Sequence, residues 1–289
     1  MMMFVLNIFI ADYFNLGGVT YSNNPNEVIL EMGNIFTDGL NLVAYCLILL
    51  PWIFSTIRKQ WYRVSVLILS VVVLIAVMVA GKRISFTGII FGFVVYLFTT
   101  KNKSKVFQVV TVLTLLIVIL SPIFIDKLER QLQIRENRLQ IDTYEGEARY
   151  LETFIVVDEI LSFDSPIISI FGKELFNSPF NYGNGIFGDR QLHVDYNVIL
   201  HGSGIIGFFL YIFSSLFLYG NYLSLRKQVM KYYTNDVAAK YFHPIFISVF
   251  WLGFWFALSG GINGVMFQSF RSFVLGGIIG ILEARKAQS

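Results

Sequence analysis

The stretch "HVDYNVILHGSGIIGFFLYIF", His193 to Phe213, joins a His and an Asp to the start of a long apolar run that holds two glycines. The apolar run extends from residue 197 to residue 221. About 20 consecutive apolar residues are enough to cross the hydrocarbon core of a bilayer. The stretch therefore predicts a membrane-spanning helix with ionisable residues, His193 and Asp195, at its N-terminal end.

The composition of the whole chain agrees with a membrane protein. Of its 289 residues, 55% are hydrophobic and only 14% are charged, whereas about a quarter of the residues of a soluble domain are charged. The chain has a single cysteine, Cys46, which lies inside an apolar run. One cysteine excludes a disulfide framework within the chain and a cysteine-based metal site. The lipid bilayer is the expected partner, and no nucleic acid is expected.

Seven apolar segments are predicted to span the membrane, and the short segment 1–14 is a candidate partial or interfacial helix. The seven segments are 38–57, 63–81, 84–100, 105–125, 197–221, 242–261 and 264–282. They predict an all-α integral membrane protein with about seven to eight transmembrane helices. Three regions follow: an N-terminal transmembrane bundle (1–125), a periplasmic, partly helical loop (126–196) and a C-terminal transmembrane bundle (197–289).

Basic residues predict the sidedness of these spans. Lys and Arg in short loops stay on the cytoplasmic side, and the clusters here follow alternate predicted spans. They are Arg58, Lys59 and Arg63; Lys101, Lys103 and Lys105; Arg226, Lys227 and Lys231; and Arg285 and Lys286. The loop 126–196 is then on the outer side, with helices expected over 126–140 and 146–161 and an irregular segment over 178–191.

Several cations break the sidedness rule. Arg83 opens a span on the outer side, Arg149 and Arg190 lie in the outer loop, and Arg271 lies inside the last apolar run. A charge at the membrane boundary indicates function by default. Because the guanidinium group binds phosphate oxygens in pairs, these arginines point to an anionic ligand on the outer face.

A structural role is open for each of these side chains. Arg83 could extend to the headgroups, Arg149 could pair with a nearby carboxylate such as Glu152, and Arg190 could belong to a solvated turn. His193 could bind a loop carbonyl, and Arg271 could have a structural partner. Gly204 and Gly207, three residues apart, have the spacing that lets another helix approach closely.

The ordered set of motifs resembles the O-antigen polymerase and O-antigen ligase superfamily, the Wzy-like and WaaL-like membrane proteins. His193 and the Gly204–Gly207 pair resemble the family's His and Gly-x-x-Gly signature. "AGKRISFTGIIFGF" (80–93) resembles its arginine-led helix start. "GEARYLETFIVVDEIL" (146–161) with "IFGKELF" (170–176) resembles the start of its large periplasmic loop. The residues after the His, Val194, Asp195 and Tyr196, resemble polymerases more than ligases.

The resemblance implies an enzyme of the bacterial cytoplasmic membrane that transfers a glycan from an undecaprenyl-pyrophosphate carrier to a sugar hydroxyl on the periplasmic side. It implies an inverting displacement. Arg83, Arg149, Arg190 and Arg271 are the candidate pyrophosphate ligands. His193 is the first candidate base, and Asp195 is the second. No paired carboxylates suited to Mg²⁺ stand in the outer loop, so we expect metal-independent catalysis without a cofactor. A chain-length regulator and a flippase are the implied pathway partners.

Three other functions stay open. An O-antigen ligase would join the glycan to lipid A-core instead of extending it. A transporter of lipid-linked sugars also needs outer arginines, but it should show related halves and charges near the middle of the membrane. The third is a non-catalytic accessory subunit. Substitution of His193 should abolish the turnover of an enzyme but hardly affect an accessory subunit.

Overall fold

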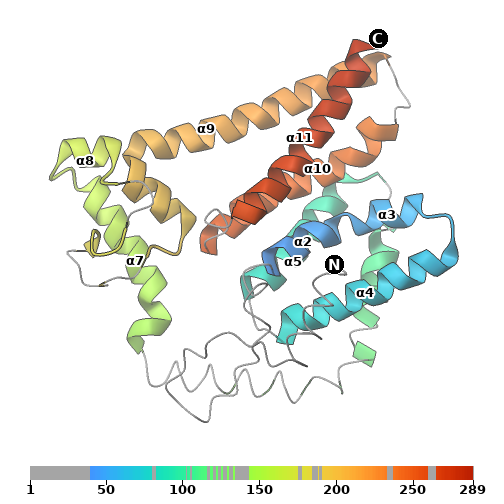
Figure 1. Cartoon of the computed structure of the whole chain (residues 1–289), viewed down its shortest axis with the longest axis horizontal. Helices are drawn as coiled ribbons and strands as arrows, with labels where there is room; N and C mark the ends of the chain where they lie inside the picture. Colours follow the sequence, from blue (N-terminus) through green and yellow to red (C-terminus); the bar gives the residue numbers. More distant parts are fainter. Residues whose placement is uncertain are drawn as a thin grey trace. The chain divides into compact units, whose positions relative to one another are not determined.

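The computed structural model describes residues 40–79, 83–101, 143–174, 178–183, 188, 191–232, 237–259 and 265–288, with scattered residues between 103 and 133. In these residues every regular element is a helix (Figure 1). The expected all-α class is therefore confirmed for the part of the chain that the structure describes. The predicted helix over 126–140 and the segment 1–14 lie outside the described residues, apart from Glu129 and Gln133.

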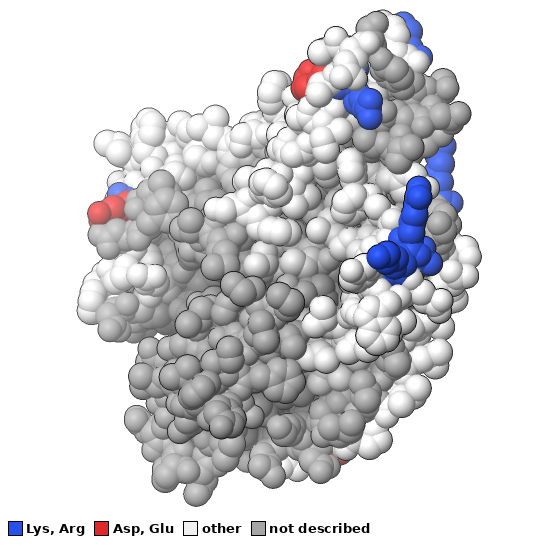
Figure 2. All heavy atoms as spheres, turned by 45° about the vertical axis from the view of Figure 1, so that its right-hand side comes forward, with Lys and Arg blue, Asp and Glu red and all other residues white. Residues whose placement is uncertain are grey.

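The described chain forms two compact units. The first comprises residues 1–137, 240–252 and 269–275, and the second comprises 138–239, 253–268 and 276–289. Most of the described surface in Figure 2 belongs to residues that are neither basic nor acidic, as the low charge content requires.

The first unit contains α2 (Leu40–Ile48), α3 (Leu50–Thr56), α4 (Gln60–Val79) and α5 (Arg83–Thr99). The buried Ser85 hydroxyl of α5 donates to Oδ1 of the buried Asn41 on α2, at 2.6 Å. Gly92 of α5 lies where a Cβ atom would come within 2.7 Å of Cδ1 of Ile48. One polar bond and one small residue thus fix how these two helices pack.

Most predicted spans coincide with helices, with shifted ends. The segment predicted over 38–57 is two helices, because Leu49 interrupts it before a proline in the first turn of α3. The segments predicted over 242–261 and 264–282 correspond to α10 (Val237–Phe256) with a short 3₁₀ turn (Ala257–Ser259) and to α11 (Val265–Ala287).

One described helix, α9 (Asp195–Tyr232), is long and apolar enough to cross a membrane. The apolar stretches in the other described helices are shorter, 10–17 residues, such as Gln60–Ile75 in α4 and Tyr241–Phe256 in α10. The predicted number of seven to eight spans is therefore not shown. In the most apolar 18-residue stretch of α9, only 22% of the residues are buried. Most of its apolar side chains therefore face outward, as a lipid-facing helix requires.

A kink divides α9 at Gly204, whose backbone angles are φ 61° and ψ −164°. Glycine reaches this region without the steric cost that a Cβ atom imposes. The part that follows the kink has about 28 residues, roughly 42 Å at 1.5 Å per residue, which exceeds the hydrocarbon thickness on its own. The part before the kink packs against α7 and against the end of α8.

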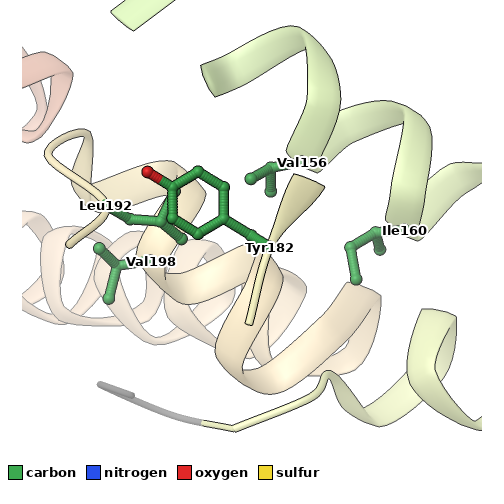
Figure 3. Close-up of a cluster of buried hydrophobic side chains, with 5 residues drawn as sticks. All are labelled: Val156, Ile160, Tyr182, Leu192 and Val198. Carbon is green, nitrogen blue, oxygen red and sulfur yellow. The ribbon is translucent and has the colours of Figure 1, made fainter. Parts of the chain in front are cut away.

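The core of the second unit joins α7 (Thr143–Leu161), the described segments 178–183 and 191–192 and the first turns of α9 (Figure 3). Its members are Val156, Ile160, Tyr182, Leu192 and Val198. A short helix that the sequence did not predict, α8 (Pro166–Phe171), contributes Ile168 to this core. Burying side chains of this kind contributes about 1.5–3 kcal/mol each, and the cluster fixes the segment that carries His193.

Candidate functional site

The structure places the predicted residues in different parts of the chain. His193, Asp195, Gly204 and Gly207 belong to the second unit, around the start of α9. Arg271 belongs to the first unit. The backbone of Arg83 opens α5 and that of Arg149 lies in α7, but their side chains are outside what the structure describes, as is the whole of Arg190.

His193 stands just before α9, within the irregular residues 191–194. Its side chain is 43% exposed. Two bonds hold its backbone: the N–H of His193 donates to Oε1 of Glu152 at 2.8 Å, and the N–H of Leu192 donates to the Ser178 hydroxyl at 2.9 Å. The imidazole is therefore presented to the outside on a fixed backbone.

Glu152 of α7 is the residue that sequence reasoning missed as part of this site. Its side chain is fully buried, and its Oε2 lies 3.8 Å from Nδ1 of His193. A signal was present in the sequence: Glu152, Val156 and Ile160 recur every four residues on the buried face of one helix. A carboxylate on an apolar stripe costs free energy unless it is hydrogen-bonded or paired.

Asp195 is the first residue of α9 and is fully buried. A carboxylate there interacts favourably with the positive end of the helix dipole. His193 precedes the helix, so the two candidate bases do not lie on one helix. Because it is buried, the Asp195 carboxylate is less accessible than the His193 imidazole, which is 43% exposed.

Two further bonds fix the first turn of α9. The Asn197 amide donates to the Thr153 hydroxyl of α7 at 2.8 Å, and the Tyr196 hydroxyl donates to the carbonyl of Phe254 at 2.9 Å. Asn197 is buried. Glu152 and Thr153 thus connect α7 to His193 and to the first turn of α9, and the Tyr196 bond connects that turn to α10.

Gly204 lies at a close approach, but the segment that approaches is the end of α8. A Cβ on Gly204 would lie 2.5 Å from the carbonyl carbon of Ile170, and one on Gly172 would lie 2.4 Å from the nitrogen of Ser203. A Cβ on Gly207 would meet the Ser203 hydroxyl of its own helix at 1.9 Å. The approach of another membrane span to these glycines stays a prediction.

A polar network also connects α7, the residue that follows Gly172, and α9. The Lys173 ammonium donates to Glu159 and to the carbonyl of Asn181, and the latter bond is 2.9 Å long. Nε2 of the buried His201 lies 3.1 Å from the same carbonyl and must donate to it, because a carbonyl only accepts. The backbone N–H of Lys173 donates to the carbonyl of His201 at 2.8 Å.

A pocket of about 550 Å³ opens beside α7, next to the Lys173–Glu159 pair. Asp158, Glu159, Asp164 and Lys173 line it, together with Phe154, whose side chain is largely exposed. Among the described residues, no group of three or more His, Cys, Asp or Glu side chains is placed to hold a metal ion. Metal independence stays a prediction.

Arg271 of α11 is buried in the first unit. Its Nη2 donates a long bond of 3.5 Å to the carbonyl of Phe250, and its guanidinium lies 6.0 Å from the centre of the Phe250 ring. Its Nε has no hydrogen-bond partner among the described residues. A buried guanidinium with so few contacts is suited to an anionic ligand.

No family model, curated protein or solved structure matches this chain. The resemblance to the O-antigen polymerase and ligase superfamily therefore rests on the quoted motifs and their order along the sequence. The site geometry adds what the motifs alone do not show: Glu152, which lies within the motif at 146–161, is buried beside His193.

Proposed function

We propose that this chain is a polytopic glycosyltransferase of the bacterial cytoplasmic membrane, with about seven to eight spans and a site that faces the periplasm. It extends a polysaccharide, transferring glycan from an undecaprenyl-pyrophosphate carrier to a sugar hydroxyl. One observation carries the proposal: a half-exposed His193, backed by a fully buried Glu152, stands at the start of the described helix that is long enough to span a membrane.

In the proposed reaction, His193 takes the proton from the acceptor hydroxyl. The acceptor oxygen forms a bond to the anomeric carbon while the bond from that carbon to the pyrophosphate oxygen breaks. The pyrophosphate leaves with the electron pair, so negative charge grows at the membrane boundary. Arg83, Arg149, Arg190 and Arg271 are the proposed ligands for that charge.

The location of the site follows from the chemistry of the substrate. The polyprenyl tail of the carrier belongs in lipid, beside the exposed apolar side chains that follow Gly204 in α9, such as Phe209, Phe213 and Phe217. The sugar belongs in water, where His193 lies in this proposal. The kink at Gly204 separates these two environments.

A lipopolysaccharide gel tests the proposal. A strain that lacks the gene is complemented with the wild type, His193→Ala, Arg83→Ala or Arg149→Ala. Gln191→Ala serves as the control, because Gln191 is exposed in the same segment. We expect the wild type and the control to give a ladder, and the other three variants to give core with a single repeat.

Other gel patterns identify the competing functions. Bare core with carrier-linked polymer would indicate a ligase. A full ladder in the strain without the gene would exclude both functions for lipopolysaccharide. A ladder that needs the protein but tolerates His193→Ala and the arginine variants would favour an accessory role.

A further inference from the structure

We propose that Glu152 is a positioning residue that sets the tautomer of His193, keeping the proton on Nδ1 and leaving the lone pair on Nε2. Nδ1 is the ring nitrogen that faces Oε2 of Glu152, at 3.8 Å. This separation is too long for a hydrogen bond, but it is within the range that tightens when a substrate binds.

The direction of the effect follows from the hydrogen-bonding properties of the groups. An ionised carboxylate only accepts hydrogen bonds, so it favours the tautomer with a proton on the nitrogen that faces it. Oε1 of Glu152 is already used by the backbone N–H of His193 at 2.8 Å. Oε2 is the oxygen that lies toward the imidazole ring, 3.8 Å from Nδ1.

The same two contacts fix the rotation of the carboxylate. Because the first oxygen is bound to the backbone of residue 193, the second is directed toward the side chain of that residue. Glu152 and His193 are 41 positions apart in the sequence, and packing of α7 against the first turns of α9 brings them together. The carboxylate is fully buried, which shields its interaction with the ring from water.

The catalytic use of this arrangement rests on the proposed glycan transfer, whereas the tautomer itself does not. A lone pair on Nε2 lets His193 accept the proton of the acceptor hydroxyl. The imidazolium that forms then carries protons on both nitrogens, and the negative carboxylate stabilises it. Glu152 acts through His193 and contacts no substrate atom in this scheme.

The variant Glu152→Gln gives a sharp test. The amide oxygen must face the backbone N–H of His193, so the amide NH₂ takes the place of Oε2. An NH₂ group donates to Nδ1 and moves the proton to Nε2. We expect the tautomer to invert while the shape of the side chain is kept. Glu152→Asp keeps the charge and should keep the wild-type tautomer.

The measurement is ¹⁵N NMR of histidine-labelled, full-length protein in lipid bilayers, without substrate. The chain has three histidines, His193, His201 and His243, and the His193→Gln variant assigns the signal of interest. The signals of His201 and His243 report whether each variant is folded. A wild-type His193 with its proton on Nδ1, inverted in Glu152→Gln and retained in Glu152→Asp, supports the proposal.

A wild-type His193 with its proton on Nε2 would overturn the proposal without any variant, even if Glu152→Gln fails to fold. An unchanged tautomer in a folded Glu152→Gln protein would also overturn it. The transfer assay is read separately, and there Glu152→Gln should lower chain growth by about 10²–10⁴-fold, with partial recovery in Glu152→Asp. If the tautomers behave as expected but His193→Ala keeps its ladder, the proposed function fails and the positioning role remains.

Discussion

Gly172 and Gly204 pack backbone against backbone, although they are more than thirty residues apart in the chain. A Cβ on Gly204 would lie 2.6 Å from the nitrogen of Gly172, and both residues have positive φ angles, 82° at Gly172 and 61° at Gly204. This contact fastens the end of α8 to the kink of α9.

Replacing Gly204 by Ala should destabilise the protein by about 2–4 kcal/mol, because the change adds a steric clash with backbone to an unfavourable φ angle. Thermal unfolding in detergent measures the effect. Gly220→Ala is the matched control in the same helix, since a Cβ there meets no atom within 4 Å, and it should be neutral or slightly stabilising. Equal melting temperatures for the two variants would contradict the close packing.

Lys173 and Glu159 should be energetically coupled. Their side chains are 19% and 21% exposed, so solvent screens the pair only in part. We expect Lys173→Met and Glu159→Gln to destabilise the protein individually and to show a coupling of about 1–2 kcal/mol in a double-mutant cycle. Lys227→Met, at an exposed position, is the control. Strictly additive effects would show that the pair contributes nothing specific.

Helix positions were predictable from the sequence because apolar runs are long and interrupted by few charges. The segments predicted over 63–81 and 84–100 became α4 and α5 with ends shifted by a few residues. Ends are harder to predict because they depend on local bonds. For example, α9 extends past its predicted end at residue 221 to Tyr232, through a polar stretch that the hydropathy pattern does not include.

The candidate site was predictable in part. His193 stands out because an imidazole at the mouth of an apolar run is conspicuous. Glu152 is visible in the sequence only as a carboxylate on an apolar stripe. Its contact with His193 is not visible, since the two residues are 41 positions apart. The kink at Gly204 was equally hidden, because a glycine in a helical pattern indicates close packing or an unusual φ angle, and only the fold decides between them.

The proposed sidedness can be measured by cysteine labelling. In a Cys46→Ser background the chain has no other cysteine. Gln191→Cys, before α9, should react with a membrane-impermeant maleimide in cells whose outer membrane admits the reagent. Lys227→Cys, near the other end of the helix, should react only after the cytoplasmic membrane is opened. Both positions are exposed. The reverse labelling pattern would place His193 in the cytoplasm and refute the proposed function.

Replacing Arg271 by an apolar residue should keep or raise the stability of the protein while its activity is lost. Arg271 is 9% exposed, and its guanidinium contacts a carbonyl and a ring, with no carboxylate partner among the described residues. Replacing a buried charge of this kind by an apolar side chain is often neutral or stabilising. We therefore expect Arg271→Met to keep or raise the melting temperature by a few degrees while chain growth is lost.

The conservative variant separates charge from geometry at this position. Arg271→Lys keeps the positive charge but not the planar pair of donors that binds phosphate oxygens, so it should retain only partial activity. Melting temperature and the polysaccharide ladder are measured on the same membranes. An unfolded Arg271→Met protein would instead assign the arginine a structural partner, and an active one would remove Arg271 from the proposed pyrophosphate site.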